Sequence, residues 1–435
     1  MSGIALAAAS FAVLTLVIYS GIHISTALFL VAIGGIWLLN GDLATAVKLM
    51  GLTAGDAISD YDYGVIPLFV LMGLLVMQAG VGNDSYAVAH QLFRRVPGGL
   101  GHATVAGNAI FSAITGVSVA AVVLFTRLAV PEMVARGYDK RFAVGVVAGS
   151  AMLGMLIPPS VLMIVYAILT DVSIGSLFLA GIVPGLLLAA AFSGAILVLA
   201  LRHPERFGGG RDGADLPLGA GELLRKSVPI ALLVAAVLGG MYAGVFTATE
   251  AGAVGATAAL VLALVRRCLS WRIAWQLLVD TGHVTASLVI IIIAASVYSR
   301  FLAMAGLPGA IEAWIQSAQF SLHAVLAVYV LVVLLLGTAL DSTSTTLIAV
   351  PIFTVAFKLL GADLVWIGII TMITVEIGLI TPPLGMAPFV IKMTLQDPGI
   401  SLEDIYAGAL PFAAAAFAVV LLVIAFPGLA LGLVR

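Results

Sequence analysis

The sequence predicts an all-α polytopic membrane protein built from two inverted repeats, each with a re-entrant hairpin and a broken helix. Two observations lead to this fold class. First, the 435 residues are 62% hydrophobic and only 9% charged, against roughly 25% charged in soluble domains. Second, one pattern of prolines occurs twice, in the same order and at nearly the same spacing. Its members are Ala129-Val130-Pro131, Pro158-Pro159 and Pro184 in the first half, and Ala349-Val350-Pro351, Pro382-Pro383 and Pro411 in the second.

The composition limits the classes of protein to which this chain can belong. Apolar runs long enough to cross a ~30 Å hydrocarbon core, about 20 residues each, recur from end to end. The most polar stretch, 202–226, is a short connector, so no sizeable soluble domain is expected. The single cysteine, Cys268, excludes an internal disulfide and a cysteine-based metal cluster. The net charge of −2 offers no basic surface, so nucleic acid is not expected as a partner.

The N-terminal region, residues 1–62, is expected to contribute two scaffold spans, at about 4–20 and 22–39. The first run lacks a basic leader, so we interpret it as a retained span rather than a cleaved signal. The acidic loop 40–62 lies one crossing before a basic pair and is placed in the periplasm, which puts the N-terminus outside. The basic loops belong in the cytoplasm by the positive-inside rule. They lie at 94–95, 127–141, 202–226 and 266–272.

The first repeat, residues 63–201, is predicted to contain both irregular elements. The stretch 101–131 is apolar and begins and ends on the cytoplasmic side. Its interruption at Thr115-Gly116-Val117-Ser118 favours a re-entrant hairpin over two full crossings. The next span, 142–170, holds Pro158-Pro159 and is predicted to be a broken helix, because proline removes an amide donor and distorts the residue before it.

The connector and scaffold helices, residues 202–275, lead into the second repeat, residues 276–435. A span near 283–306 carries the chain outward, so the second hairpin, 321–357, is expected to enter from the periplasm. Two hairpins that enter from opposite faces are the product of an inverted repeat.

The tip of the second hairpin is the polar run Asp341-Ser342-Thr343-Ser344-Thr345, and a broken helix with Pro382-Pro383, residues 363–396, follows it. A helix that stops inside a membrane leaves backbone groups unpaired, at several kcal/mol each, unless protein, water or an ion satisfies them. Carbonyl and hydroxyl oxygens suit Na⁺, whereas helix N-termini, with roughly +0.5 charge, favour an anion. The repeated breaks therefore predict a secondary transporter with its site between the repeats.

The candidate site residues lie at the two tips and the two breaks. For a cation, they are Ser118, Gly154, Pro158, Asp341, Ser342, Thr345, Thr381 and Pro382. For the substrate, they are Thr115, Gly116, Ser118, Ser160, Ser344 and Thr345. Any single Ser or Thr can instead bond its own helix or pack as a small residue.

Two acidic residues in apolar surroundings carry a separate argument. An acidic side chain costs about 2.5–3.5 kcal/mol at the bilayer centre, so Asp341 indicates an ion-facing or functional role. Glu376 is subject to the same argument, but it can also cap a helix or pair within the bundle. An intramembrane hydrolase would need such an acid pair, yet the duplicated scaffold argues against it and no catalytic motif occurs. The chain is therefore not expected to be an enzyme.

Other patterns indicate packing rather than chemistry. Thr247 and Glu250 have the spacing of a capping box that opens a helix over 248–265. Small residues at the spacing of close helix contacts are Gly145 with Gly149 and Gly181 with Gly185.

Seven stretches, in the same order along nearly the whole chain, resemble the large membrane (M) subunit of tripartite ATP-independent periplasmic (TRAP) transporters. They are Phe111–Ala121 (FSAITGVSVAA), Val130–Phe142 (VPEMVARGYDKRF), Leu153–Ser160 (LGMLIPPS), Leu177–Leu187 (LFLAGIVPGLL), Gly244–Gly255 (GVFTATEAGAVG), Leu340–Phe353 (LDSTSTTLIAVPIF) and Val375–Gly385 (VEIGLITPPLG). The chain departs from the family pattern at Val117, where a second Ser is usual, at Thr374, where Asn is usual, and at Ala248, where Pro is usual.

The resemblance implies an elevator-type, Na⁺-driven importer of a small organic anion, a carboxylate or sulfonate, in the bacterial inner membrane. Two or more Na⁺ ions are implied, with ligands at Ser118, Asp341, the double-proline segments and, in place of the usual Asn, Thr374. The implied partners are a small membrane (Q) subunit, expected as a separate chain, a periplasmic substrate-binding (P) protein and membrane lipid. The hairpins and broken helices are expected to move against a scaffold of 175–201, 228–265 and the N-terminal spans.

One alternative stays open within transporters. A stand-alone or H⁺-coupled organic-anion symporter would take its substrate directly from solution, with Asp341 or Glu376 as the proton site. The substrate also stays open among C4-dicarboxylates, keto acids, sugar acids and sulfonates, because the resemblance implies that the binding protein largely selects it. A purely structural subunit would not need two broken helices.

Overall fold

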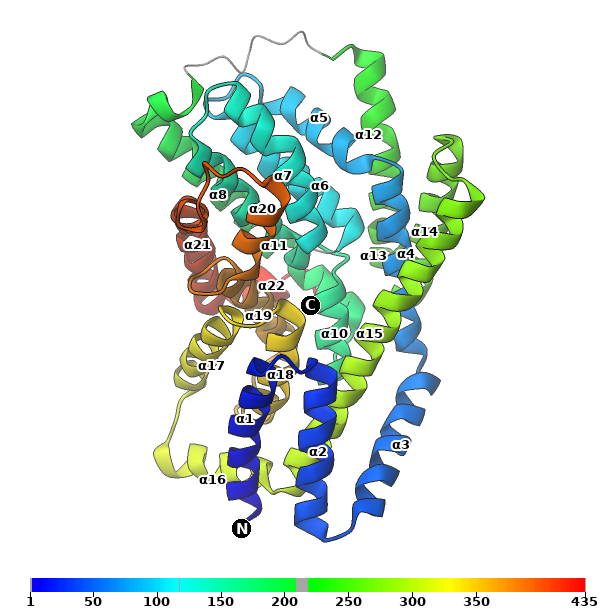
Figure 1. The fold of residues 1–435 in the computed structure, drawn as a ribbon, viewed down its shortest axis with the longest axis vertical. Coiled ribbons are helices and arrows are strands. Elements are labelled where there is room, and N and C mark those ends of the chain that lie inside the picture. The colour runs from blue at the N-terminus through cyan, green and yellow to red at the C-terminus, as the bar shows by residue number, and fades with distance from the viewer. Residues whose placement is uncertain (1, 117, 209–217, 435) are drawn as a thin grey trace.

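The computed structural model describes residues 2–116, 118–208 and 218–434. Over these ranges the chain forms a bundle of helices joined by short turns (Figure 1). In the same ranges eight helices are long and apolar enough to cross a membrane, and a bent pair, Lys140–Leu156 with Val161–Thr170, would make a ninth. The expected all-α, multi-pass architecture is confirmed.

The N-terminal region forms three helices at the lower end of Figure 1: α1 (Gly3–Tyr19), α2 (Ile24–Asn40) and α3 (Leu43–Ser59). The first two are the predicted spans, whereas α3 occupies the predicted loop 40–62. Asp42 caps α3 by accepting hydrogen bonds from the amides of Ala44 and Thr45, at 2.9 and 3.1 Å. The helix then packs against α2 and α15, which explains why this polar stretch is ordered.

The first repeat has a helix break that the sequence analysis did not predict. Gly80, with a φ of 74°, separates α4 from α5, so the single predicted crossing after the acidic loop is two helices. Pro131 and Pro184 lie inside α7 and α11. The helices of this part of the chain are η1 (Tyr61–Gly64), α4 (Val65–Gln78), α5 (Val81–Phe93), α6 (Gly99–Thr115), α7 (Ser118–Ala135), α8 (Lys140–Ala151), α9 (Leu153–Leu156), α10 (Val161–Thr170), α11 (Ile174–Arg202) and η2 (Pro204–Arg206).

The connector leads into a further group of helices. The predicted capping box is confirmed, because the Thr247 hydroxyl accepts from the Glu250 amide at 3.3 Å and the Glu250 carboxylate accepts from the Thr247 amide at 2.8 Å. Arg266 fixes this group to the first repeat by an ion pair with Asp84, at 2.6 Å. The helices are α12 (Ala220–Val234), the π-helical turn η4 (Ala235–Gly239), α13 (Gly240–Tyr242) and α14 (Ala248–Val265).

The second repeat has the same order of elements as the first. Its first helix, α15, has 34 residues and is longer than the predicted span near 283–306. Pro351 and Pro411 lie inside α18 and α21, as their counterparts do in α7 and α11. The helices are α15 (Trp271–Met304), α16 (Leu307–Ala318), α17 (Leu322–Gly337), α18 (Ser342–Leu359), α19 (Leu364–Leu379), α20 (Met386–Leu395), α21 (Leu402–Ala425) and α22 (Gly428–Leu431).

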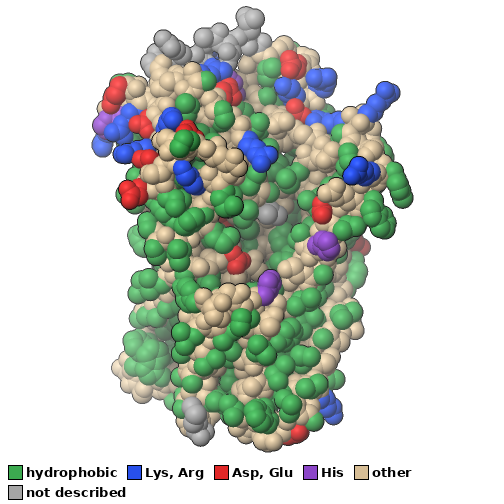
Figure 2. All heavy atoms as spheres, viewed as in Figure 1, with side chains coloured by type: hydrophobic (Ala, Val, Ile, Leu, Met, Phe, Trp, Pro, Cys, Tyr) green, Lys and Arg blue, Asp and Glu red, His purple; other side chains and the backbone are tan. Residues whose placement is uncertain are grey.

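The two hairpins approach the middle of the molecule from opposite ends. In Figure 1, α6 and α7 come from the upper end, whereas α17 and α18 come from the lower end, where the N-terminus also lies. Figure 2 shows Lys and Arg side chains gathered at the upper end, which the positive-inside rule assigns to the cytoplasm. The orientation of the repeats in a membrane and the depth of each tip in a bilayer stay predictions.

Glycines bring the two repeats into close contact. A Cβ atom on Gly145 of α8 would fall on the backbone of Gly408 of α21, and one on Gly149 would fall on an aromatic side chain of the same helix. Gly181 and Gly185 of α11 pack in the same way against the chain at the first helix break. The close packing predicted for these glycines is confirmed.

Two ion pairs join the repeats at the end of this contact where α8 begins. Lys140 Nζ lies 3.0 Å from Asp397 Oδ2, and Arg141 Nε lies 2.6 Å from Asp404 Oδ1. A hydrogen bond from the Gly399 amide and then the pairing with Lys140 hold the pKa of Asp397 below its ordinary value. Because these groups are exposed, they fix the alignment of the repeats more than they stabilise it.

Replacing Gly145 with alanine tests the contact between the repeats. The added methyl group would force α8 away from α21, which should destabilise the fold by about 1–3 kcal/mol and lower its melting temperature in detergent. The control is Gly194→Ala in α11, where an added Cβ meets nothing within 4 Å. Equal melting temperatures for the two variants would contradict the close packing.

Candidate functional site

The first hairpin turns at a glycine that touches the first helix break. α6 ends at Thr115, and Gly116 takes the left-handed conformation with a φ of 64°. A Cβ atom on Gly116 would collide with the Pro159 carbonyl oxygen. The Gly116 carbonyl accepts a hydrogen bond from the Val161 amide at 3.3 Å, so the tip and the break form one unit. Val117, one of the departures from the family pattern, lies outside the described residues.

The first break is a bend of 44° between the two halves of the broken helix, α8 with α9 and then α10. Ile157, which precedes the prolines, is extended, as proline requires of its neighbour. Ser160 then caps α10 by accepting from the Met163 amide at 3.4 Å. A Cβ atom on Gly154 would lie 2.9 Å from the Cα atom of Ser118. The candidates that this unit brings together are Gly116, Ser118, Gly154, Pro158 and Ser160.

Asp341, at the second tip, is the N-cap of α18. Its carboxylate accepts hydrogen bonds from the amides of Thr343 at 3.0 Å and Ser344 at 3.1 Å, and from the Ser344 hydroxyl. The positive end of the helix dipole also favours a negative charge here. The sequence analysis missed this capping role, although an Asp directly before a helical run is a known signal for it. The cap explains how an acidic group is held at the tip of the hairpin.

The second break separates α19, which ends at Leu379, from α20. Thr374 and Thr381 donate hydrogen bonds to carbonyl oxygens four residues earlier, at 2.7 and 2.6 Å, which is the structural role left open by the sequence. A Cβ atom on Gly385 would lie 2.5 Å from the Leu379 carbonyl oxygen and 2.8 Å from that of Thr381. Backbone oxygens therefore converge where the helix is interrupted.

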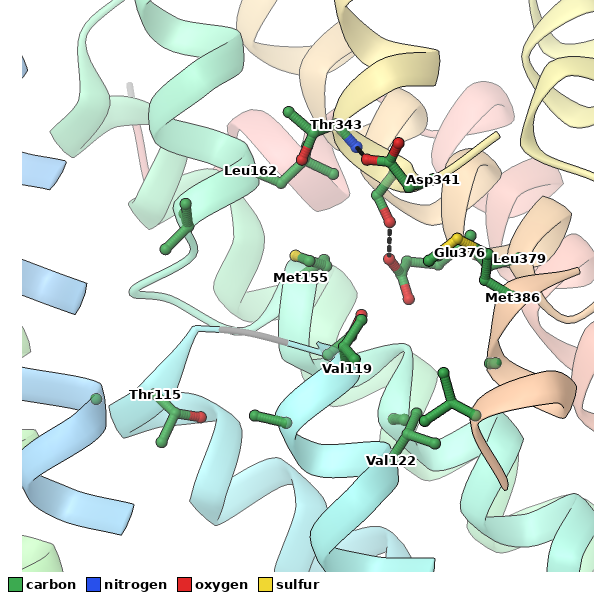
Figure 3. Close-up of a pocket in the computed structure, with 18 of the residues that line it drawn as sticks. Thr115, Val119, Val122, Met155, Leu162, Asp341, Thr343, Glu376, Leu379 and Met386 are labelled. Carbon is green, nitrogen blue, oxygen red and sulfur yellow. Dashed lines mark hydrogen bonds between the residues drawn. The ribbon is translucent and has the colours of Figure 1, made fainter. Parts of the chain in front are cut away.

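Glu376, on α19, connects the tips of the two hairpins. Its Oε1 accepts a hydrogen bond from Ser342 Oγ at 2.9 Å, and the Ser118 hydroxyl also faces this carboxylate. The Glu376 side chain is only 3% exposed, and in Figure 3 it points into the space between the tips. One carboxylate therefore contacts a residue from each repeat.

A cavity of about 290 Å³ lies between the two tips. Both tips, both broken helices, α4 and α15 contribute to its wall. Its described lining includes two carboxylates, Asp341 and Glu376, and no Lys, Arg or His. The remainder is mostly apolar and includes Val119, Met155 and Leu162, which are labelled in Figure 3. An anion in this cavity would face acidic groups and no cationic side chain.

The cavity divides the candidate residues into two groups. Those that line it are Thr115, Ser118, Asp341 and Ser342. Those outside its lining, in the surrounding tips and breaks, are Gly116, Gly154, Pro158, Ser160, Ser344, Thr345, Thr374, Thr381 and Pro382. In the described chain the Thr345 hydroxyl oxygen is buried without a hydrogen-bond partner, so it is free to bind a cation.

The apolar part of the cavity wall was not predicted from the sequence. Val70 and Leu74 of α4, together with Val284 and Leu288 of α15, line the same cavity. No pattern in the sequence separates such residues from lipid-facing ones, since both are apolar positions of long helices. The prolines and polar interruptions that mark the tips have no counterpart in these segments.

The chain is similar to a known family of membrane proteins. A family model described as "Tripartite ATP-independent periplasmic transporter, DctM component" matches residues 3–429. The C4-dicarboxylate TRAP transporter large permease protein DctM of Pseudomonas aeruginosa is 33% identical over 396 residues, which cover 89% of this chain and 90% of that protein. The sialic acid TRAP transporter large permease protein SiaM of Vibrio cholerae is 29% identical over 415 residues, which cover 94% of both chains.

A further relative and a solved structure extend the comparison. The isethionate TRAP transporter permease protein DctMQ of Oleidesulfovibrio alaskensis is 29% identical over 378 residues, which cover 86% of this chain and 58% of that protein. The crystal structure of the Alcanivorax borkumensis YdaH transporter has a TM-score of 0.61 at 14% identity, with 88% of this chain and 90% of that one covered. At this identity the likeness concerns the fold alone.

Substitutions of Asp341 test its capping role. Asp341→Ala removes the cap of α18 and should cost about 1 kcal/mol of stability, whereas Asp341→Asn keeps an accepting oxygen and should cost little. Melting temperatures of the purified variants in detergent, measured without Na⁺, check this difference. Equal losses for the two variants would show that the charge, rather than the cap, holds the tip.

Proposed function

The chain belongs to the family of the DctM component of tripartite ATP-independent periplasmic transporters, and from this premise we propose that it imports a small organic anion together with Na⁺. Its relatives are transporter permeases, and the chain is a multi-pass membrane transporter rather than an enzyme. In the proposal it lies in the bacterial inner membrane and receives its substrate from a periplasmic binding protein.

The acidic lining of the cavity supports the Na⁺ proposal. Asp341 and Glu376 are the ionisable residues in its described lining, and both are acidic. At an effective dielectric constant near 20, one carboxylate 4 Å from a bound anion repels it by about 4 kcal/mol. Cations that neutralise these carboxyl groups remove the repulsion. The N-terminus of α18 at the tip then adds a favourable dipole.

The proposed cation ligands fall into two sets, one for each tip and break. The first set is Ser118, Gly154 and the carbonyl oxygens before Pro158. The second set is Asp341, Ser342, Thr345, Thr374, Thr381 and the carbonyl oxygens before Pro382. The unpartnered Thr345 hydroxyl and the backbone oxygens around Gly385 support the second set, because Na⁺ prefers oxygens of this kind.

We place the hairpins and broken helices in one body that moves against a scaffold. The glycine contacts and the Arg141–Asp404 ion pair between α8 and α21 support a single body, since they join the two repeats directly. We also assign α11 to this body, in place of the scaffold role expected for 175–201, because it packs against α6, α9, α19, α21 and α22. The scaffold then consists of α1–α4 and α12–α16.

The number of ions decides whether the membrane potential contributes. Two Na⁺ with one monovalent anion carry a net positive charge inward, and 100 mV then contributes about 2.3 kcal/mol, on the order of fifty-fold accumulation. One Na⁺ would leave the step electroneutral. We therefore propose at least two.

The proposed partners are the periplasmic binding protein and a small membrane subunit. The relative named DctMQ is longer than the region that this chain matches. A separate chain for the small subunit stays a prediction here.

Reconstituted transport tests the proposal as a whole. Uptake into proteoliposomes that contain the chain and its small subunit should require Na⁺ and the binding protein, and an inside-negative K⁺/valinomycin potential should increase it. Uptake that is independent of Na⁺ but increases with an inward pH gradient would instead support the H⁺-coupled alternative.

Asp341→Asn should raise the Na⁺ concentration for half-maximal uptake by about tenfold or more, because it removes a charge from the proposed ion site. The matched control is Asp42→Asn, since Asp42 caps α3 through two amides and a hydroxyl in the same pattern, far from the cavity. An unchanged Na⁺ titration for Asp341→Asn would remove this residue from the ion site.

A further inference from the structure

The cavity between the tips has a polar part and an apolar wall, and this division bears on the substrate. We infer, on the basis of the anion transport proposed above, that the substrate is a small monocarboxylate with an aliphatic or aromatic body. Its carboxylate would lie at the tips, and its body against the apolar wall.

The wall away from the tips is built from hydrocarbon side chains. Its residues come from four directions: Val70 of α4, Leu162 of α10, Val284 of α15 and Val390 of α20 are examples. The polar side chains of the described lining are confined to the two tips and Glu376. A ligand with one charged end and one apolar end matches this distribution, because apolar surface is best buried against apolar surface.

Most polar groups in the lining are already engaged. The Thr115 hydroxyl donates to the Phe111 carbonyl at 3.0 Å, and the Ser342 hydroxyl donates to Glu376 at 2.9 Å. The Asp341 carboxylate accepts from two amides of α18. A sugar acid would bring several hydroxyls into this cavity with few partners, and each unpaired hydroxyl weakens binding by about tenfold.

A second carboxylate on the substrate would also weaken binding in this cavity. The described lining offers no Lys, Arg or His to pair with it, and burial of an unpaired charge against hydrocarbon is strongly unfavourable. The volume of about 290 Å³ lies at the lower end of the range for ligand pockets, roughly 300–1,000 Å³, so the body must be small. The geometry therefore favours a monocarboxylate over a dicarboxylate or a polyhydroxylated acid.

Ligand-induced thermal stabilisation of the purified full chain, with its small subunit, tests this inference without the binding protein. The probes are 3-methyl-2-oxobutanoate, succinate, N-acetylneuraminate and isethionate, each titrated in Na⁺ and in choline. We expect Na⁺-dependent stabilisation by the branched oxo acid at a concentration at least about tenfold lower than for the other three. Equal or better Na⁺-dependent stabilisation by succinate or N-acetylneuraminate would overturn the substrate class and leave the proposed function standing. The absence of Na⁺-dependent stabilisation by any probe would overturn both.

An isosteric substitution in the wall gives a second test. Val390→Thr on α20 places a hydroxyl in the apolar wall away from the tips and should weaken binding of 3-methyl-2-oxobutanoate by about tenfold, with the melting temperature of the free protein unchanged. The matched control is Val328→Thr on α17, an exposed position outside the cavity, which should leave binding unchanged. Undiminished binding by Val390→Thr would contradict the apolar wall.

Discussion

A peptide group inside a bilayer must find a hydrogen-bond partner, and the architecture of this protein follows from the places where its helices fail to supply one. Each repeat interrupts two helices, at a hairpin tip and at a pair of prolines. Hydrogen bonds satisfy part of each interruption locally. The Gly116 carbonyl accepts a hydrogen bond from the Val161 amide, and the Asp341 carboxylate accepts hydrogen bonds from the first amides of α18. The other oxygens at these tips and breaks are the proposed ion ligands.

The parts of the fold that were predicted from the sequence are those with local causes. Proline pairs, a left-handed glycine and a Thr–Glu capping box act within a few residues, so the breaks near Pro158 and Pro382 and the turn at Gly116 could be predicted. The missing parts depend on distant neighbours. The helix α3 is stabilised by packing on α2 and α15 as well as by its cap, and the apolar cavity wall consists of ordinary membrane-helix residues. The capping role of Asp341 also has a local cause, an Asp directly before a helical run, and was therefore predictable as well.

The two acidic residues of the cavity have different structural positions, although the sequence made the same argument for both. Asp341 is held by backbone amides at a helix N-terminus, where a negative charge is favoured. Glu376 instead lies within α19 and faces Ser342 and Ser118, the first residues of α18 and α7. An ion at one tip and an ion at the other would therefore act on one shared carboxylate. Through this carboxylate, an ion bound at the tip of the first repeat would change the affinity for an ion at the tip of the second.

The length of α15 has a consequence for the surrounding lipid. A straight helix of 34 residues is about 51 Å long, far beyond a hydrocarbon core of ~30 Å. Such a helix must tilt strongly in the bilayer or extend beyond it. The exposed Trp271 and Trp275 in its first turns are suited to the headgroup region of the membrane. Bilayer thickness would then set the slope of a helix that forms part of the cavity wall. Membranes of different thickness would thus change the shape of the cavity between the tips without any change to its polar residues.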